Sequence, residues 1–176
     1  MIAAKDIANA LDEDRSKDNV LRIIQAIEKQ GTDYREFFQI VHEQPASKCW
    51  RMTWMLSSLV ERNPKIGNEI QELVWKQLKP CEHQGMQRDL WRTLTFVDIS
   101  EELSGSVYDF ACNVIASAHY PVAVRVHAMQ CAFNIAKPWP ELRDELKMIL
   151  DSLGPEESVG TRNRAGKLSA RLARIK

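Results

Sequence analysis

The sequence predicts an all-α fold made of stacked antiparallel helical hairpins. Three observations lead to this prediction: apolar residues recur at helical spacing along nearly the whole chain, the breaks between these stripes are short, and the pattern repeats about every 37 residues. No segment shows the sustained alternation of apolar and polar residues that marks a half-buried strand, so we expect no strands.

Each expected helix carries one apolar stripe, because residues three and four apart lie on the same side of a helix. In chain order the stripes are Val20, Ile23, Ile24 and Ile27; Tyr34, Phe37, Phe38 and Val41; Ile70, Leu73, Val74 and Leu78; Val107, Phe110, Ala111 and Val114; and Leu142, Leu146, Ile149, Leu150 and Leu153. Together with the remaining segments, these stripes predict about ten helices.

The breaks between stripes carry residues that begin or end helices. They lie at 31–33, 44–45, 63–64, 79–80, 98–100, 120–121, 138–140 and 154–155. Asp33 and Glu36 have the spacing of a capping box. Short connections make neighbouring helices antiparallel, so we expect hairpins at 17–44, 45–80, 82–119 and 121–154, then a capping helix at 158–176, all within one domain, 1–176.

An internal repeat supports this division. Four arginines lie 37 residues apart, at Arg51, Arg88, Arg125 and Arg162. Trp54 and Trp91 occupy equivalent positions three residues after the first two arginines, and this equivalence favours packing in the core. For the arginines themselves, two interpretations stay open: a row of cations that binds phosphates or carboxylates, or a ladder that joins successive repeats.

A hairpin repeat of this length, from about Val20 to Lys176, resembles the HEAT and armadillo-like superfamily of α-solenoids. The resemblance implies a right-handed superhelix in which the second helix of each hairpin lines a concave binding face. The regular proline, aspartate and arginine columns of the HEAT consensus are missing, so the HEAT and armadillo subtypes and a generic helical bundle stay open as alternatives.

The alignment of the repeats places a mildly acidic strip on the expected concave face. The candidate binding residues there are Glu69, Glu72, Asp109, Asn113 and Glu145. An acidic surface repels a phosphate backbone and attracts a basic protein or peptide. Trp139 is a sixth candidate, because it lies in the inserted turn Pro138-Trp139-Pro140, either as a hydrophobic staple or as an interface anchor.

Catalytic and metal-binding patterns are missing from the sequence. There is no glycine-rich phosphate loop, no GxSxG, no HExxH and no CxxC pair. His127 and Cys131 are four residues apart on one helix, but a zinc site needs further ligands, and buried inert thiols are the favoured interpretation of Cys112 and Cys131. We therefore expect no enzyme activity, no cofactor and no metal.

Charge and composition limit the partners further. The chain has 24 basic and 24 acidic side chains and a pI near 6.9, which argues against a dedicated nucleic-acid or membrane binder. The basic segment 162–176 is either a solvated capping helix or a local contact for nucleic acid or an acidic membrane. Scattered cysteines, an N-terminus unlike a signal peptide and the absence of long apolar runs favour a cytoplasmic protein.

The sequence thus predicts a non-catalytic scaffold that binds a protein or peptide on its concave face, without contact with a membrane. The alternative is a nucleic-acid-binding protein related to the DNA-alkylation-repair glycosylases, which are also HEAT-like. In such a protein an aromatic residue and an acid would grip a damaged base, for example Trp91 with Asp98 or Trp54 with Glu61.

Overall fold

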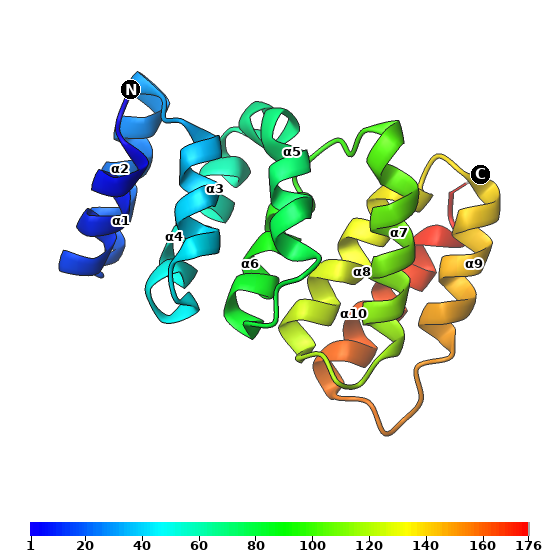
Figure 1. The fold of residues 1–176 in the computed structure, drawn as a ribbon. Coiled ribbons are helices and arrows are strands. Elements are labelled where there is room, and N and C mark those ends of the chain that lie inside the picture. The colour runs from blue at the N-terminus through cyan, green and yellow to red at the C-terminus, as the bar shows by residue number, and fades with distance from the viewer. Residues whose placement is uncertain (176) are drawn as a thin grey trace. The chain divides into compact units, whose positions relative to one another are not determined.

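The structure, a computed structural model, describes residues 1–175, and these residues form ten α-helices without a strand. The helices are α1 (Ala4–Glu13), α2 (Lys17–Gln30), α3 (Tyr34–Glu43), α4 (Ala46–Arg62), α5 (Pro64–Leu78), α6 (Gln84–Leu94), α7 (Glu101–Ala116), α8 (Val122–Ala136), α9 (Pro140–Asp151) and α10 (Val159–Leu172). The predicted all-α class is therefore confirmed (Figure 1).

The chain divides into two compact units, Met1–Val97 and Asp98–Lys176. Unit 1 contains α1 to α6 and unit 2 contains α7 to α10. The boundary falls inside the expected hairpin 82–119, between its two helices. The single domain 1–176 and the right-handed superhelix stay predictions.

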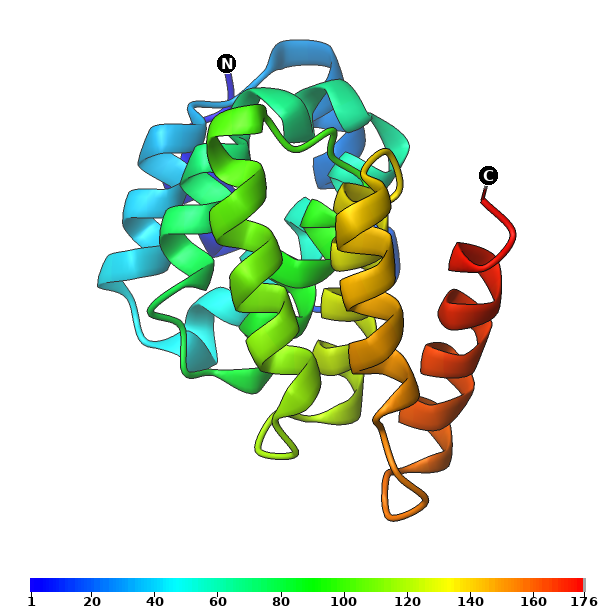
Figure 2. The same cartoon turned by 90° about the vertical axis from the view of Figure 1, so that its right-hand side faces the viewer.

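Within each unit the helices stack in two rows. In unit 1, α4 packs against α2 and α6, while α3 packs against α1 and α5. In unit 2, α8 packs against α10 and α7 packs against α9, so that α9 lies between α7 and α10 (Figure 2). Contact between each helix and the helix two places along the chain is the packing that a helical repeat produces.

The apolar stripes predicted from the sequence supply the core of both units. Ile24 and Phe37 in unit 1 and Val107 and Leu146 in unit 2 have no exposed surface. Complete burial of one such side chain stabilises a fold by about 1.5 to 3 kcal/mol. The two equivalent tryptophans differ, however, since Trp91 is buried and Trp54 is only half-buried.

Helix α1 was not part of the predicted hairpins, which begin at residue 17. Its buried residues Ala4, Ile7 and Leu11 have helical spacing and pack against α3 and α4. The proposed capping box also differs from its expected form. The Asp33 carboxylate accepts hydrogen bonds from the backbone N–H groups of Arg35 and Glu36, but the Glu36 carboxylate accepts from the N–H of Ala4, at 3.3 Å.

The four repeated arginines do not form one uniform ladder. Arg125 alone is buried, and it donates two hydrogen bonds to the Glu157 carboxylate, at 2.6 and 2.8 Å, and two to the carbonyl oxygen of Ile115. Arg51 stacks on Trp50, while Arg88 donates to the adjacent Asp89. Arg162 donates to the backbone of Glu157, so unit 2 joins two of the repeated arginines at one loop residue.

Other polar contacts join helices of successive repeats. Arg62 of α4 pairs with Glu28 of α2 across 34 residues, and Arg92 of α6 pairs with Glu61 of α4 across 31. In unit 2, the Tyr108 hydroxyl of α7 donates to the Leu142 carbonyl of α9, across 34 residues. The separations approximate one repeat, as expected if equivalent helices stack side by side.

We expect Arg125→Met to lower the free energy of unfolding by about 3 kcal/mol, because it leaves the Glu157 carboxylate and the Ile115 carbonyl without their buried partner. Urea denaturation followed by circular dichroism measures this loss. Arg22→Met is the control, since Arg22 and Asp14 form an exposed ion pair that contributes at most about 0.5 kcal/mol. Equal losses in the two variants would contradict the assignment.

Candidate functional site

The predicted binding residues fall into both units. Glu69 and Glu72 lie exposed on α5 of unit 1. Asp109 and Asn113 lie exposed on α7 of unit 2, and Glu145 lies exposed on α9 of the same unit. Because α7 and α9 pack against each other (Figure 2), these three residues lie on neighbouring helices, and both Asp109 and Glu145 lie close enough to Cys112 to raise the pKa of its thiol. Unit 2 therefore contains the larger part of the predicted site.

Acidic side chains dominate the outward sides of α7 and α9. We call the following exposed residues the acidic face: Glu101, Glu102, Asp109, Glu141, Asp144 and Glu145. Within each helix they are three, four, seven or eight residues apart or directly adjacent, so they share one side of that helix. The opposite sides of α7 and α9 pack against α8.

Few cations counter this charge. Helix α7 contains no lysine or arginine. Helix α9 contains Arg143, which donates to the Ile175 carbonyl at 3.1 Å, and Lys147, which pairs with Asp151 at 2.5 Å. Both cations of α9 are thus engaged within unit 2, and the acidic face keeps its negative charge.

One large apolar side chain lies within the acidic face, and a second is exposed at the start of α9. Met148 is 74% exposed on the outward side of α9, one turn beyond Asp144 and Glu145. Trp139 is 55% exposed at the N-cap of α9, so it is more accessible than a hydrophobic staple would be. Exposed apolar residues within a charged surface are typical of sites that contact a partner.

A phenol, a thiol and a carboxyl group meet between α7 and α9. Burial raises the pKa of Tyr108, and the nearby groups of Cys112 and Glu145 raise it further. Burial also raises the pKa of the Cys112 thiol to about 11, with Glu145 and Asp109 adding to this and hydrogen bonding with Tyr108 opposing it. At neutral pH the thiol is therefore protonated, which makes it a poor nucleophile.

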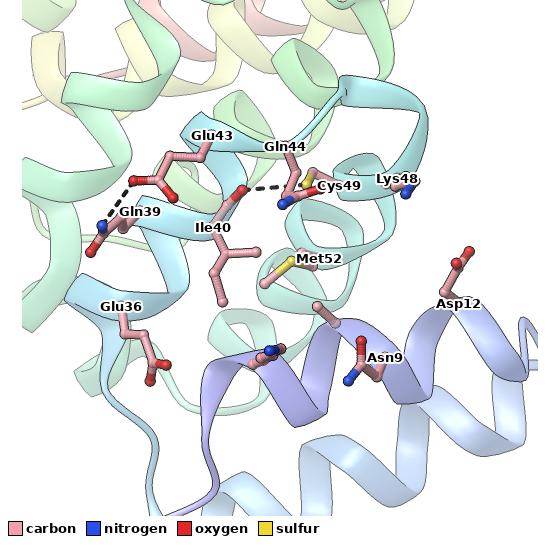
Figure 3. Close-up of a pocket in the computed structure, with 12 residues that line it drawn as sticks. Asn9, Asp12, Glu36, Gln39, Ile40, Glu43, Gln44, Lys48, Cys49 and Met52 are labelled. Atoms are coloured by element: carbon pink, nitrogen blue, oxygen red, sulfur yellow. Dashed lines mark hydrogen bonds between the residues drawn. The ribbon is translucent and has the colours of Figure 1, made fainter.

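Unit 1 contains a pocket of about 390 Å³ between α1, α3 and the start of α4 (Figure 3). Ile40, Cys49 and Met52 supply apolar surface. Sites for small ligands and for single side chains of a partner have this size and character. None of the predicted binding residues lines this pocket, because it depends on three helices whose meeting no local pattern reveals.

The acids around the pocket have partners inside the chain. Glu43 accepts a hydrogen bond from Gln39 at 2.8 Å, Asp12 pairs with Arg15, and Glu36 accepts from the Ala4 backbone. The Cys49 thiol donates to the Ile40 carbonyl, and burial raises its pKa. The pocket thus presents no activated nucleophile.

One buried carboxyl group in unit 1 was not predicted from the sequence. Asp89 of α6 is 1% exposed, and its Oδ1 accepts from Arg88 Nε at 2.9 Å, whereas its Oδ2 has no hydrogen-bond partner in residues 1–175. Burial raises the pKa of this carboxyl group despite the opposing effect of Arg88. Within residues 1–175, no three histidine, cysteine, aspartate or glutamate side chains are grouped so that they could hold a metal ion.

Comparison with known families agrees with the stacked helical pairs. A family model described as a HEAT repeat domain matches residues 7–165. The chain belongs to the HEAT repeat family. This confirms the resemblance drawn from the repeat and extends it to α1, which lay outside the predicted hairpins.

No curated protein and no solved structure matches the chain. Among residues 1–175, none of the HEAT-repeat helices has the combination of length and apolar composition needed to cross a bilayer. The family match therefore describes the fold of this HEAT-repeat protein, and any inference about what it binds has to come from its surface.

We expect Cys112 to react with a thiol reagent at a rate that rises about tenfold per pH unit from about pH 7 to pH 9 without levelling off, because its pKa of about 11 lies above this range. Peptide mapping by mass spectrometry follows this residue in the native protein. Glu145→Gln should accelerate the reaction by removing a charge that raises the pKa, while Glu141→Gln should not. A plateau near pH 8.5 would contradict the assignment.

Proposed function

We propose that this HEAT-repeat protein is a non-catalytic scaffold that binds a basic protein or peptide on the acidic face of unit 2. The observation that carries the proposal is an acidic surface on two adjacent helices, with exposed Met148 and Trp139 and no uncommitted lysine or arginine on those helices. A basic partner would approach under electrostatic attraction and bury the two apolar side chains.

The partner that fits best has cations and apolar residues on one side. Met148 lies on α9 and Trp139 is the N-cap residue of this helix, nine positions earlier, or about 14 Å along a helix axis. An amphipathic helix with apolar residues at every third or fourth position covers such a distance. Lysines or arginines beside these residues would meet Asp109 on one helix and Glu145 on the other.

Unit 1 supports this proposal less strongly. Glu69 and Glu72 on α5 are accompanied by exposed Lys65 and Lys76 on the same helix. Each lysine lies four residues from one of the acids, a spacing at which opposite charges attract within a helix. We therefore assign Glu69 and Glu72 a smaller part in binding than Asp109 and Glu145.

Features of unit 1 and unit 2 argue against enzyme activity at a thiol and against the repair-like alternative. The thiols of Cys49 and Cys112 have raised pKa values, so neither is a candidate nucleophile. For the repair-like alternative, Trp91 is buried and Glu61 is paired with Arg92, which leaves neither ready to grip a base. The acidic face itself repels a phosphate backbone.

We expect the double variant Asp109→Lys/Glu145→Lys to weaken binding of a labelled amphipathic lysine–leucine peptide by about tenfold or more, because two attractive charges become repulsive. Fluorescence anisotropy measures the Kd. Glu13→Lys/Glu82→Lys, a matched reversal at exposed positions in unit 1, should change it by less than about twofold. A pull-down of wild type and both variants from native lysate, with nuclease in every arm, extends the test to natural partners, and partners that Asp109→Lys/Glu145→Lys retains as fully as wild type does would contradict the proposal.

Trp139→Ala/Met148→Ala tests the apolar part of the surface separately. Loss of two exposed anchors should raise the Kd for the same peptide by about tenfold or more, since interface anchors contribute more than about 1 kcal/mol each. The melting temperature should stay within about 2 °C of wild type, because neither side chain is buried in the core. Unchanged binding would show that α9 does not supply the anchors.

A further inference from the structure

The terminal helix of unit 2 has a charge opposite to that of the acidic face. Helix α10 contains lysine and arginine but no acid. Three of its cations and one in the following turn form what we call the cationic stripe: Arg164, Lys167 and Arg171 on the helix, and Arg174 just beyond it. Their spacing of three or four residues places them along one side.

Arg164 is the residue of this stripe with a buried donor that has no partner. Its Nη2 donates to the side-chain oxygen of Gln130 on α8, but its Nε is buried without a hydrogen-bond partner in residues 1–175. Burial lowers the pKa of Arg164, and the neighbouring Arg171 lowers it further. A buried guanidinium donor without a partner is costly, and a negative charge beside the stripe would stabilise the Arg164 cation.

Two carboxylates on the surrounding elements are engaged by other residues. Helix α8 contains no acid. On α9, Asp151 pairs with Lys147 and accepts a hydrogen bond from Ser169 at 2.6 Å. In the loop before α10, Glu157 binds Arg125. Arg171 instead stacks on Phe133 of α8, 4.5 Å from the ring centre. Within residues 1–175, neither Arg164 nor Arg171 forms an ion pair.

We propose that the cationic stripe binds successive phosphate groups of a nucleic-acid strand. From Arg164 to Arg174 the stripe extends about 15 Å, at the rise of a helix. One strand carries a phosphate about every 3.4 Å in duplex DNA, so about four phosphates occupy the same length. Arginine suits this role because its planar guanidinium donates two parallel hydrogen bonds to a phosphate.

The exposed residues of α10 favour a nucleic acid over a membrane surface. A helix that lies on a bilayer inserts large apolar side chains. Here Leu168 and Leu172 are buried in the core, the exposed uncharged residues beside the stripe are Asn163, Gly166 and Ala170, and the one large apolar side chain that α10 exposes is Val159 at its first position. Backbone phosphates can approach the stripe closely, whereas α10 offers few large apolar side chains that could insert into a membrane.

This surface is separate from the one in the proposed function. The stripe lies on α10, which packs against α8 and α9, and the acidic face lies on the outward sides of α7 and α9 (Figure 2). One unit therefore presents a negative and a positive surface on different helices. A test of nucleic-acid binding at the stripe can therefore fail without affecting the proposed peptide binding at the acidic face, and the reverse also holds.

Fluorescence anisotropy of the full chain with a labelled single-stranded oligothymidine of about 20 nucleotides tests the proposal. Between about 50 and 200 mM KCl, the logarithm of the binding constant should fall against the logarithm of salt with a slope of about −3, as expected for four phosphate contacts. Arg171→Gln and Lys167→Gln should each weaken binding several-fold and reduce the slope by about 0.7.

Arg22→Gln, on α2 of unit 1, is the matched control and should leave both Kd and slope unchanged. Arg164→Gln should weaken binding most, and Lys167→Gln keeps the test valid if loss of the Gln130 contact perturbs folding. The proposal is overturned if the oligonucleotide does not bind at about 50 mM salt, if the stripe variants bind as wild type does, or if phosphatidylserine vesicles bind in place of the oligonucleotide.

Discussion

The whole structure depends on one constraint: no helical pair of this chain can bury its apolar stripe alone. Ile24, Phe37 and Leu146 lose all contact with water because helices of neighbouring pairs cover them. Every helix must therefore keep an apolar stripe of the right width, whatever its outer side carries. This requirement leaves the outward residues free to differ from repeat to repeat, and the candidate binding surfaces lie among them.

In unit 2 the outward residues of different helices carry opposite charges. Helices α7 and α9 carry acids on their outward sides, and α10 carries cations without an acid. Helix α8, with most of its side chains buried, packs against all three, and α9 also packs directly against α10. The balance of 24 basic and 24 acidic side chains thus averages over surfaces of opposite sign, and net charge is a poor guide to partners here.

The stripes and breaks predicted the helices because burying one side of a helix requires apolar residues at regular spacing in the sequence. They left α1 outside the predicted hairpins, although Ala4, Ile7 and Leu11 have that spacing, because the repeat was traced only from about Val20. Repeat alignment predicted that Asp109 and Glu145 share one strip, and the helices that carry them, α7 and α9, pack against each other. It could not find the pocket beside Cys49, or the unpartnered oxygen of Asp89, because each depends on side chains from elements with no common pattern.

The sequence by itself determined the helical class, the repeat and the residues of the core. Only the tertiary structure decided what each polar residue does. Arg125 and Arg51 occupy equivalent positions, yet Arg125 is buried against Glu157 while Arg51 stacks on Trp50. The physical reason is that hydrophobic burial recurs at a fixed period, whereas the pairing of a charge depends on which carboxylate or ring a neighbouring helix brings within a few ångströms.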